Sequence, residues 1–159
     1  MSLQSPVGSD HQLARLLQIG VVLEEVVEAR AAKHARESED VSDDVREFLT
    51  AAAVESAGHR DRLEALIDEL HAESIPFEEI QRLVEAQYEA DGEFDDVLYD
   101  QLCNEETAYK FYDDLINAIE GSDGSFSIDR DRLLAELRAI REEEAEGVEE
   151  VTELMEADS

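Results

Sequence analysis

Hydrophobic residues recur at alternating steps of three and four along four long stretches of this chain. That spacing draws one apolar stripe down a helix, and the strict alternation that is typical of a β-strand does not occur. The pattern predicts four helices of similar length, at about residues 10–37, 43–71, 94–120 and 128–156. We therefore expect an all-α fold in which the helices pack as an antiparallel four-helix bundle around a shared core.

The segment between the second and third predicted helices is much longer than the segments between the other consecutive helices. This connection contains a short amphipathic helix at about residues 77–89, and its length predicts a bundle whose halves are joined by one crossover. Ser42 and Ser127 precede the second and fourth helices and are expected to cap them. Residues 1–9 lack any period, so we expect a disordered lead followed by a single domain over residues 10–157.

In each predicted helix a polar residue falls on or beside the apolar stripe near the helix midpoint. These residues are Glu24 in the first helix, Glu55 and His59 in the second, Glu105 in the third and Glu144 in the fourth. Glu24 lies at the edge of its stripe, and Glu28 is the second candidate there for an inward acid. Because the midpoints of packed helices lie at about the same level, we expect these side chains to converge. The alternative is that a chain with 43 acidic residues places some of them on a stripe by chance.

Carboxylates that share one buried site repel one another, so the site needs compensating cations or bound protons. Carboxylate and imidazole ligands suit iron, manganese or zinc. Glutamates and histidines from four helices are known to hold a pair of such ions in the core of a bundle. The pattern therefore predicts a metal centre whose candidate ligands are Glu24, Glu55, His59, Glu105 and Glu144.

The chain is strongly acidic, with 43 Asp and Glu residues against 13 Lys and Arg residues and a formal net charge of −30. Acids spread over every segment, with only Lys33 and Lys110 as lysines, are typical of a halophilic surface. High salt screens the repulsion between such charges. No basic run is present that could bind phosphates, so we expect no nucleic-acid partner.

Other classes of protein are made improbable by what the sequence lacks. No apolar run approaches the length of a membrane span and no signal peptide is visible, so we expect a cytoplasmic protein without a membrane partner. Cys103 is the only cysteine, which excludes a disulfide within the chain and a metal site built on several thiolates.

The stretch Glu105–Tyr112 (EETAYKFY) ends in a phenylalanine and a tyrosine, Phe111 and Tyr112. It resembles a helix motif of the rubrerythrin branch of the ferritin-like superfamily, and the helix order and the crossover agree over about residues 10–156. The resemblance implies a ferritin-like bundle that binds two iron or manganese ions, with zinc as the alternative. It also implies which residues are the ligands and that one of two tyrosines lies beside them. The ligands would be Glu24, Glu55, His59, Glu105 and Glu144, and the tyrosine would be Tyr109 or Tyr112.

The chain departs from this family pattern in three respects. The Glu-x-x-His motif is replaced by Glu55-x-x-x-His59, which is one residue longer, and Gly147 stands where the fourth helix would carry a histidine. The cysteines of an attached rubredoxin domain are missing as well, which excludes electron delivery by such a site within this polypeptide.

Three functional hypotheses follow. The first is a ferritin-like dinuclear iron or manganese oxidoreductase that handles peroxide, oxygen or ferrous iron. The second is a non-catalytic protein of the same fold, with a mononuclear or empty site, that acts as a structural or interaction module. The third is a helical interaction module whose acids serve only solubility. The resemblance also implies a homodimer. No catalytic residue is assigned from the sequence.

Overall fold

The computed structural model describes residues 9–38, 41–71, 82, 97–122 and 126–157. These residues form four long helices, and no strand occurs among them, which confirms the all-helical class. The helices are α1 (Asp10–Glu37), α2 (Asp43–Asp68), α4 (Val97–Glu120) and α5 (Arg130–Ala157).

The observed bounds differ from the predicted ones by a few residues at some helix ends. Helix α1 has the predicted bounds, whereas α2 ends at Asp68 and α5 begins only at Arg130. Residues 1–8 of the predicted lead at 1–9 and the predicted connecting helix, apart from Arg82, lie outside the described residues, whereas Ser9 caps α1.

The helix starts are fixed by short polar side chains. Ser42 Oγ accepts a hydrogen bond from the backbone N–H of Val45 at 3.2 Å, as predicted for an N-cap. The prediction that Ser127 caps α5 was wrong, because the helix begins at Arg130 and the carboxylate of Asp129 accepts from the N–H of Asp131 at 3.4 Å.

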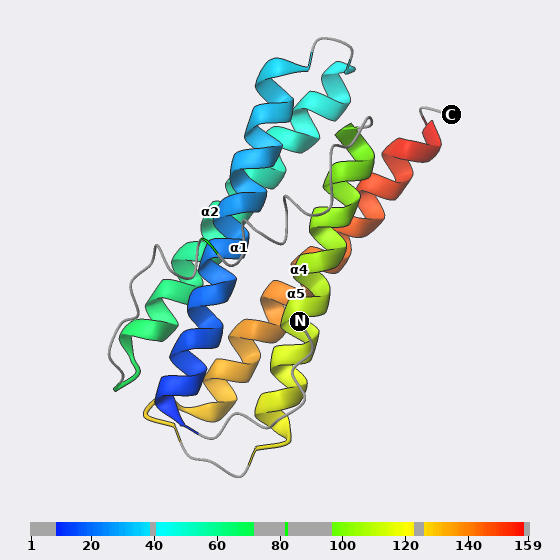
Figure 1. Cartoon of the computed structure of the whole chain (residues 1–159). Helices are drawn as coiled ribbons and strands as arrows, with labels where there is room; N and C mark the ends of the chain where they lie inside the picture. The colour runs from blue at the N-terminus through cyan, green and yellow to red at the C-terminus, as the bar shows by residue number, and fades with distance from the viewer. Residues whose placement is uncertain (1–8, 39–40, 72–81, 83–96, 123–125, 158–159) are drawn as a thin grey trace.

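Ser127 instead helps to join three parts of the chain. Asp10, the first residue of α1, accepts hydrogen bonds from the N–H of Ser127 at 3.1 Å and from the N–H of His71 at 3.0 Å. The start of α1, the segment just after α2 and the segment just before α5 therefore meet at one end of the molecule. Figure 1 shows α1 beside α2 and α4 beside α5.

The core consists of two separate hydrophobic clusters. The larger one draws on all four helices and includes Leu17, Leu63, Tyr112 and Leu137. The buried members of the smaller one are Ala35, Val45, Leu49, Leu98 and Val151. Along each helix, the positions between the members of the two clusters carry buried polar residues. These residues are Glu24, Ser56, His59, Asp100, Gln101, Asn104, Glu105 and Glu144.

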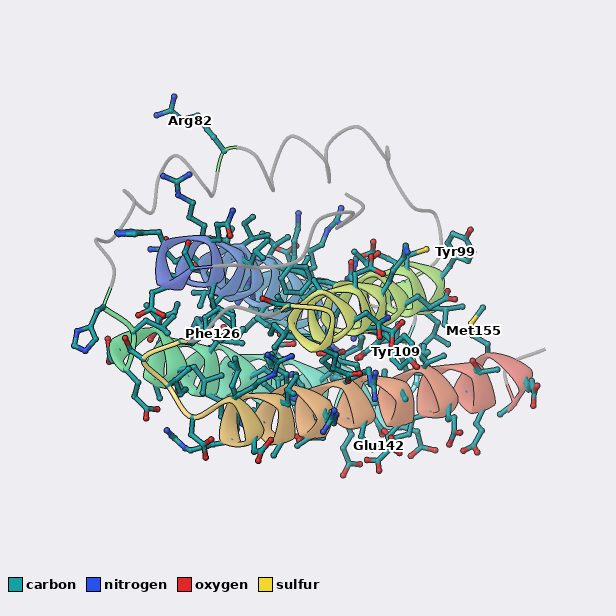
Figure 2. All side chains as sticks on the ribbon, turned by 90° about the horizontal axis from the view of Figure 1, so that it is seen from below. Arg82, Tyr99, Tyr109, Phe126, Glu142 and Met155 are labelled. Carbon is teal, nitrogen blue, oxygen red and sulfur yellow. The ribbon has the colours of Figure 1, made fainter. Side chains whose placement is uncertain are left out.

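Most of the other acids lie at the surface. Figure 2 shows Glu142 projecting from α5 away from the other helices. None of the helices in the described part of the chain combines the length and the hydrophobicity that crossing a membrane requires.

Candidate metal centre

Each of the four helices contributes one buried ionisable side chain to the polar layer between the two hydrophobic clusters. Glu24 comes from α1, His59 from α2, Glu105 from α4 and Glu144 from α5, and each of these residues is at most 5% exposed. Four of the five predicted ligand positions are thus brought together in the core. Their convergence follows from the phase of each residue on its helix and from a shared level in the bundle.

Three of these residues surround one point. The Nδ1 atom of His59 lies 3.0 Å from Oε1 of Glu144 and 3.5 Å from Oε1 of Glu24. One ligand atom from each of the three lies within 4.8 Å of the others. A single divalent ion with ligand distances of about 2.0–2.2 Å can be reached from all three side chains after small adjustments.

The Glu24 carboxylate is held on one side and unsatisfied on the other. The hydroxyl of Tyr112 donates a hydrogen bond to Glu24 Oε1 at 2.8 Å, and both side chains are fully buried. Glu24 Oε2 is buried and has no hydrogen-bond partner among the described residues. An unsatisfied carboxylate oxygen is costly in a protein core, and a bound cation would satisfy it. The donor set therefore fits a metal ion.

Glu105 lies beside these three residues but outside their cluster of ligand atoms. The side-chain amide of Gln101, one turn earlier on α4, donates to Glu105 Oε1 at 2.8 Å. A second hydrogen bond joins Glu105 to Glu144. Glu105 thus contacts the triad through Glu144, and it is not one of the three residues whose ligand atoms cluster.

The outer edge of the site is formed by a network of charged residues. Nε2 of His59 lies 3.3 Å from Oε1 of Glu143, whose other oxygen accepts a hydrogen bond from Arg62 at 2.8 Å. Burial alone would raise the pKa of Glu143, but the hydrogen bond and charge of Arg62 outweigh it and lower that pKa. Glu143 therefore remains ionised beside His59.

Burial and mutual repulsion raise the pKa values of the inner carboxyl groups. Burial is the main cause for both Glu105 and Glu144, and the charge of Glu24 adds to it. Glu144, whose pKa is raised far above its usual range, holds the proton of its hydrogen bond with Glu105. Burial also raises the pKa of the Tyr112 hydroxyl, so it keeps its proton and donates to Glu24.

His59 responds to the acids around it. Burial lowers the pKa of its imidazole, but the hydrogen bond and charge of Glu24, together with the charges of Glu55 and Glu143, raise the net value. The surrounding acids therefore favour the charged form of the imidazole, which would compensate part of the negative charge of the metal-free site.

The prediction that Glu55 lies on the buried face of α2 was wrong. Its side chain is 42% exposed, and its carboxylate lies 4.0 Å from Nε2 of His59. The buried stripe of α2 passes through Leu49 and Ser56. The expected stripe, through Phe48 and Glu55, lies one residue earlier on the helix. Glu55 therefore lies at the mouth of the site, where burial of its carboxyl group raises its pKa to about 7.

Two further candidates, Tyr109 and Glu28, also lie away from the ligands. Tyr109, one of the two tyrosines expected beside the ligands, is 38% exposed, because Ala108 takes the buried position on α4. Glu28 accepts a hydrogen bond from Arg60 at 2.6 Å near the surface between α1 and α2. Tyr112 alone contacts a candidate ligand directly.

Sequence reasoning missed the amide and acid that continue the polar layer along α4. Gln101 lies one helical turn before Glu105, and this spacing was the available signal for its role. Asp100 is also buried and lies 2.7 Å from Nε2 of His34. Asp100 lies midway between Leu98 and Leu102 in the sequence, and this position gave no sign that it faces α1.

Comparisons of the chain with protein-family models, with curated proteins and with solved structures found no match.

Proposed function

We propose that this chain binds a divalent transition-metal ion in its core, with Glu24, His59 and Glu144 as the protein ligands. The main support is the cluster of one ligand atom from each of these buried residues, all within 4.8 Å of one another. Two carboxylates and one imidazole suit iron, manganese or zinc. The Oε2 atom of Glu24 gives independent support, because it has no hydrogen-bond partner in the described part of the chain and a cation would satisfy it.

The residues of the chain would bind, orient and shield the ion, which itself supplies Lewis-acid or redox chemistry when bound. Tyr112 fixes the orientation of Glu24 through its hydrogen bond, as residues behind a metal ligand commonly do. The hydrophobic clusters on both sides of the polar layer limit the access of water. Metal ligands must be deprotonated, so the proton of Glu144 would pass along its hydrogen bond to Glu105, which would then donate to Glu144.

We further infer a ferritin-like arrangement, with antiparallel helices, one crossover between α2 and α4, and a homodimer. The hydrogen bonds of Asp10 support the topology alone, since it requires the start of α1, the end of α2 and the start of α5 to meet. An experimental structure would test the topology, and sedimentation equilibrium would test the dimer.

Elemental analysis of protein purified in high salt without chelators is the first test of metal binding. We expect iron, manganese or zinc in at least a one-to-one ratio to the chain, and a rise in the thermal midpoint when metal is returned to stripped protein. His59→Ala and Glu24→Gln should abolish both effects. Glu142→Gln is the matched control, because this side chain projects into solvent. Protein that binds no metal, with an unchanged midpoint, would contradict the proposal.

A second candidate function is oxidation of ferrous iron at this centre, with the electrons of the iron reducing peroxide or oxygen. The direct hydrogen bond from Tyr112 to Glu24 favours it, because a fixed hydroxyl can steady a ligand while the charge of the ion changes. Consumption of peroxide or oxygen by the iron-loaded protein tests it. Tyr112→Phe should slow this reaction and Tyr109→Phe should not. Iron-loaded protein that consumes neither oxidant would leave metal binding as the function.

A further inference from the structure

Gly147 lies directly beneath the carboxylate of Glu105. A Cβ atom built on Gly147 would lie 2.6 Å from Oε2, 2.8 Å from Cδ and 3.0 Å from Oε1 of Glu105. Such distances are far shorter than ordinary contacts, so any side chain at this position would displace the carboxylate. The absence of a side chain on Gly147 therefore creates the space in which Glu105 lies.

Two hydrogen bonds hold Glu105 in this space. Gln101 donates to its Oε1 atom at 2.8 Å, and Glu144 forms the second bond. With its carboxylate held against α5, Glu105 contributes no atom to the cluster formed by Glu24, His59 and Glu144.

The remaining three ligands are too few for two neighbouring ions. A pair of ions in a dinuclear site lies about 3.5–4 Å apart and shares several carboxylates. Glu105 is the buried carboxylate that could serve a second ion, but it is bonded to Gln101 and Glu144. Glu55, the other nearby predicted ligand, is 42% exposed and lies at the mouth of the site.

We infer that Gly147 determines how many ions the centre takes. By accommodating Glu105 against α5, it keeps this carboxylate out of the ligand set, so that the chain binds one ion on Glu24, His59 and Glu144. Glu105 then acts as a positioning residue that hydrogen-bonds Glu144. This inference rests on the metal-binding function proposed above and specifies its stoichiometry.

Titration of metal-free protein with Co²⁺, followed by calorimetry and by visible absorption, tests the inference. We expect one Co²⁺ per chain in the unaltered protein. Glu105→Gln should keep this ratio and change Kd by less than threefold, whereas Glu144→Gln should raise Kd more than tenfold. Loss of Co²⁺ binding in Glu105→Gln would show that Glu105 is a ligand and would overturn the inference.

Gly147→Ala provides the second arm. The added methyl group should push Glu105 out of its place and toward the ion, lowering Kd about tenfold and weakening the visible Co²⁺ bands as the coordination number rises. Gly58→Ala is the matched control, since a Cβ atom there meets nothing within 4 Å. In a Glu105→Ala background, Gly147→Ala should have no effect on Kd or on the spectrum. An unchanged spectrum and Kd in Gly147→Ala alone would overturn the inference.

The stoichiometry of the unaltered protein separates the two proposals. Two ions per chain would overturn the role of Gly147 while leaving metal binding intact. No ion would overturn metal binding itself, and the inference with it.

Discussion

The hydroxyl of Tyr112 on α4 donates a hydrogen bond to Oε1 of Glu24 on α1, at 2.8 Å and out of contact with solvent. We expect Tyr112→Phe to lower the free energy of unfolding of the metal-free protein by about 1–3 kcal/mol, because a buried acceptor loses its donor. Urea denaturation measures this change. Tyr109→Phe on the exposed side of the same helix should change it by less than about 0.5 kcal/mol. Equal effects of the two substitutions would mean that the buried hydrogen bond contributes little.

The metal-free protein should be more stable at pH 5 than at pH 8. Burial raises the pKa of Glu55 from 4.5 to about 7, and it also raises the pKa values of Glu105 and Glu144. Above about pH 4.5 these three groups bind more protons in the folded chain than in the unfolded chain, so the stability that they contribute falls as the pH rises through the folded pKa values. The raised pKa of His59 acts in the same direction.

Urea midpoints of chelator-treated protein between pH 4.5 and pH 8 measure this dependence. Glu144→Gln should flatten it, because glutamine keeps the shape of the side chain but has no proton to lose. Metal affinity should follow the opposite trend and increase with pH, since the ligands bind in their deprotonated forms. A stability that rises with pH in the metal-free protein would show that the buried carboxyl groups are ionised.

Glu28 should be irrelevant to metal affinity in spite of its position one turn after Glu24. It is paired with Arg60 at 2.6 Å, and both side chains are partly exposed. Glu28→Ala should therefore leave Kd for Co²⁺ within about twofold and reduce stability by no more than about 1 kcal/mol. Calorimetric titration and urea denaturation provide the two values. A tenfold loss of affinity would place Glu28 among the ligands.

Salt should stabilise this protein strongly. With a net charge of −30, its surface carboxylates repel one another over a distance that shrinks from about 10 Å at 0.1 M salt to about 3 Å at 1 M. We expect the thermal midpoint to rise steadily with KCl over this range. A neutral solute at the same osmolality serves as the control. A midpoint that does not change with KCl would indicate that the repulsion is already balanced within the fold.

The helices could be predicted closely because their polar and apolar residues alternate with a clear helical period. Which face of α2 is buried could not be predicted. Phe48 and Leu49 are adjacent and both apolar, so either can begin the buried stripe. Choosing Phe48 places Glu55 inside, whereas the structure buries Leu49 and Ser56. The partner helices decide between the two phases, and a single sequence does not display them.

The convergence of Glu24, His59, Glu105 and Glu144 was predictable because each falls near the midpoint of its helix and on its inner side. The sequence did not predict that three of these residues form a cluster of ligand atoms while Glu105 stays outside it. This arrangement depends on the distance between α4 and α5 and on the missing side chain of Gly147. The resemblance to a family motif had indicated this glycine only as a position where a histidine was expected.

The three proposed ligands lie on three different helices, and His59 and Glu144 are 85 residues apart in the chain. An ion bound to both would be a reversible cross-link between the α1–α2 pair and the α4–α5 pair. By the relation for covalent cross-links, closing a loop of this size removes about 4–5 kcal/mol of chain entropy from the unfolded state. Loss of the ion to a chelator would then require the two pairs to separate. The rate of metal loss would then report how often the α1–α2 pair and the α4–α5 pair separate.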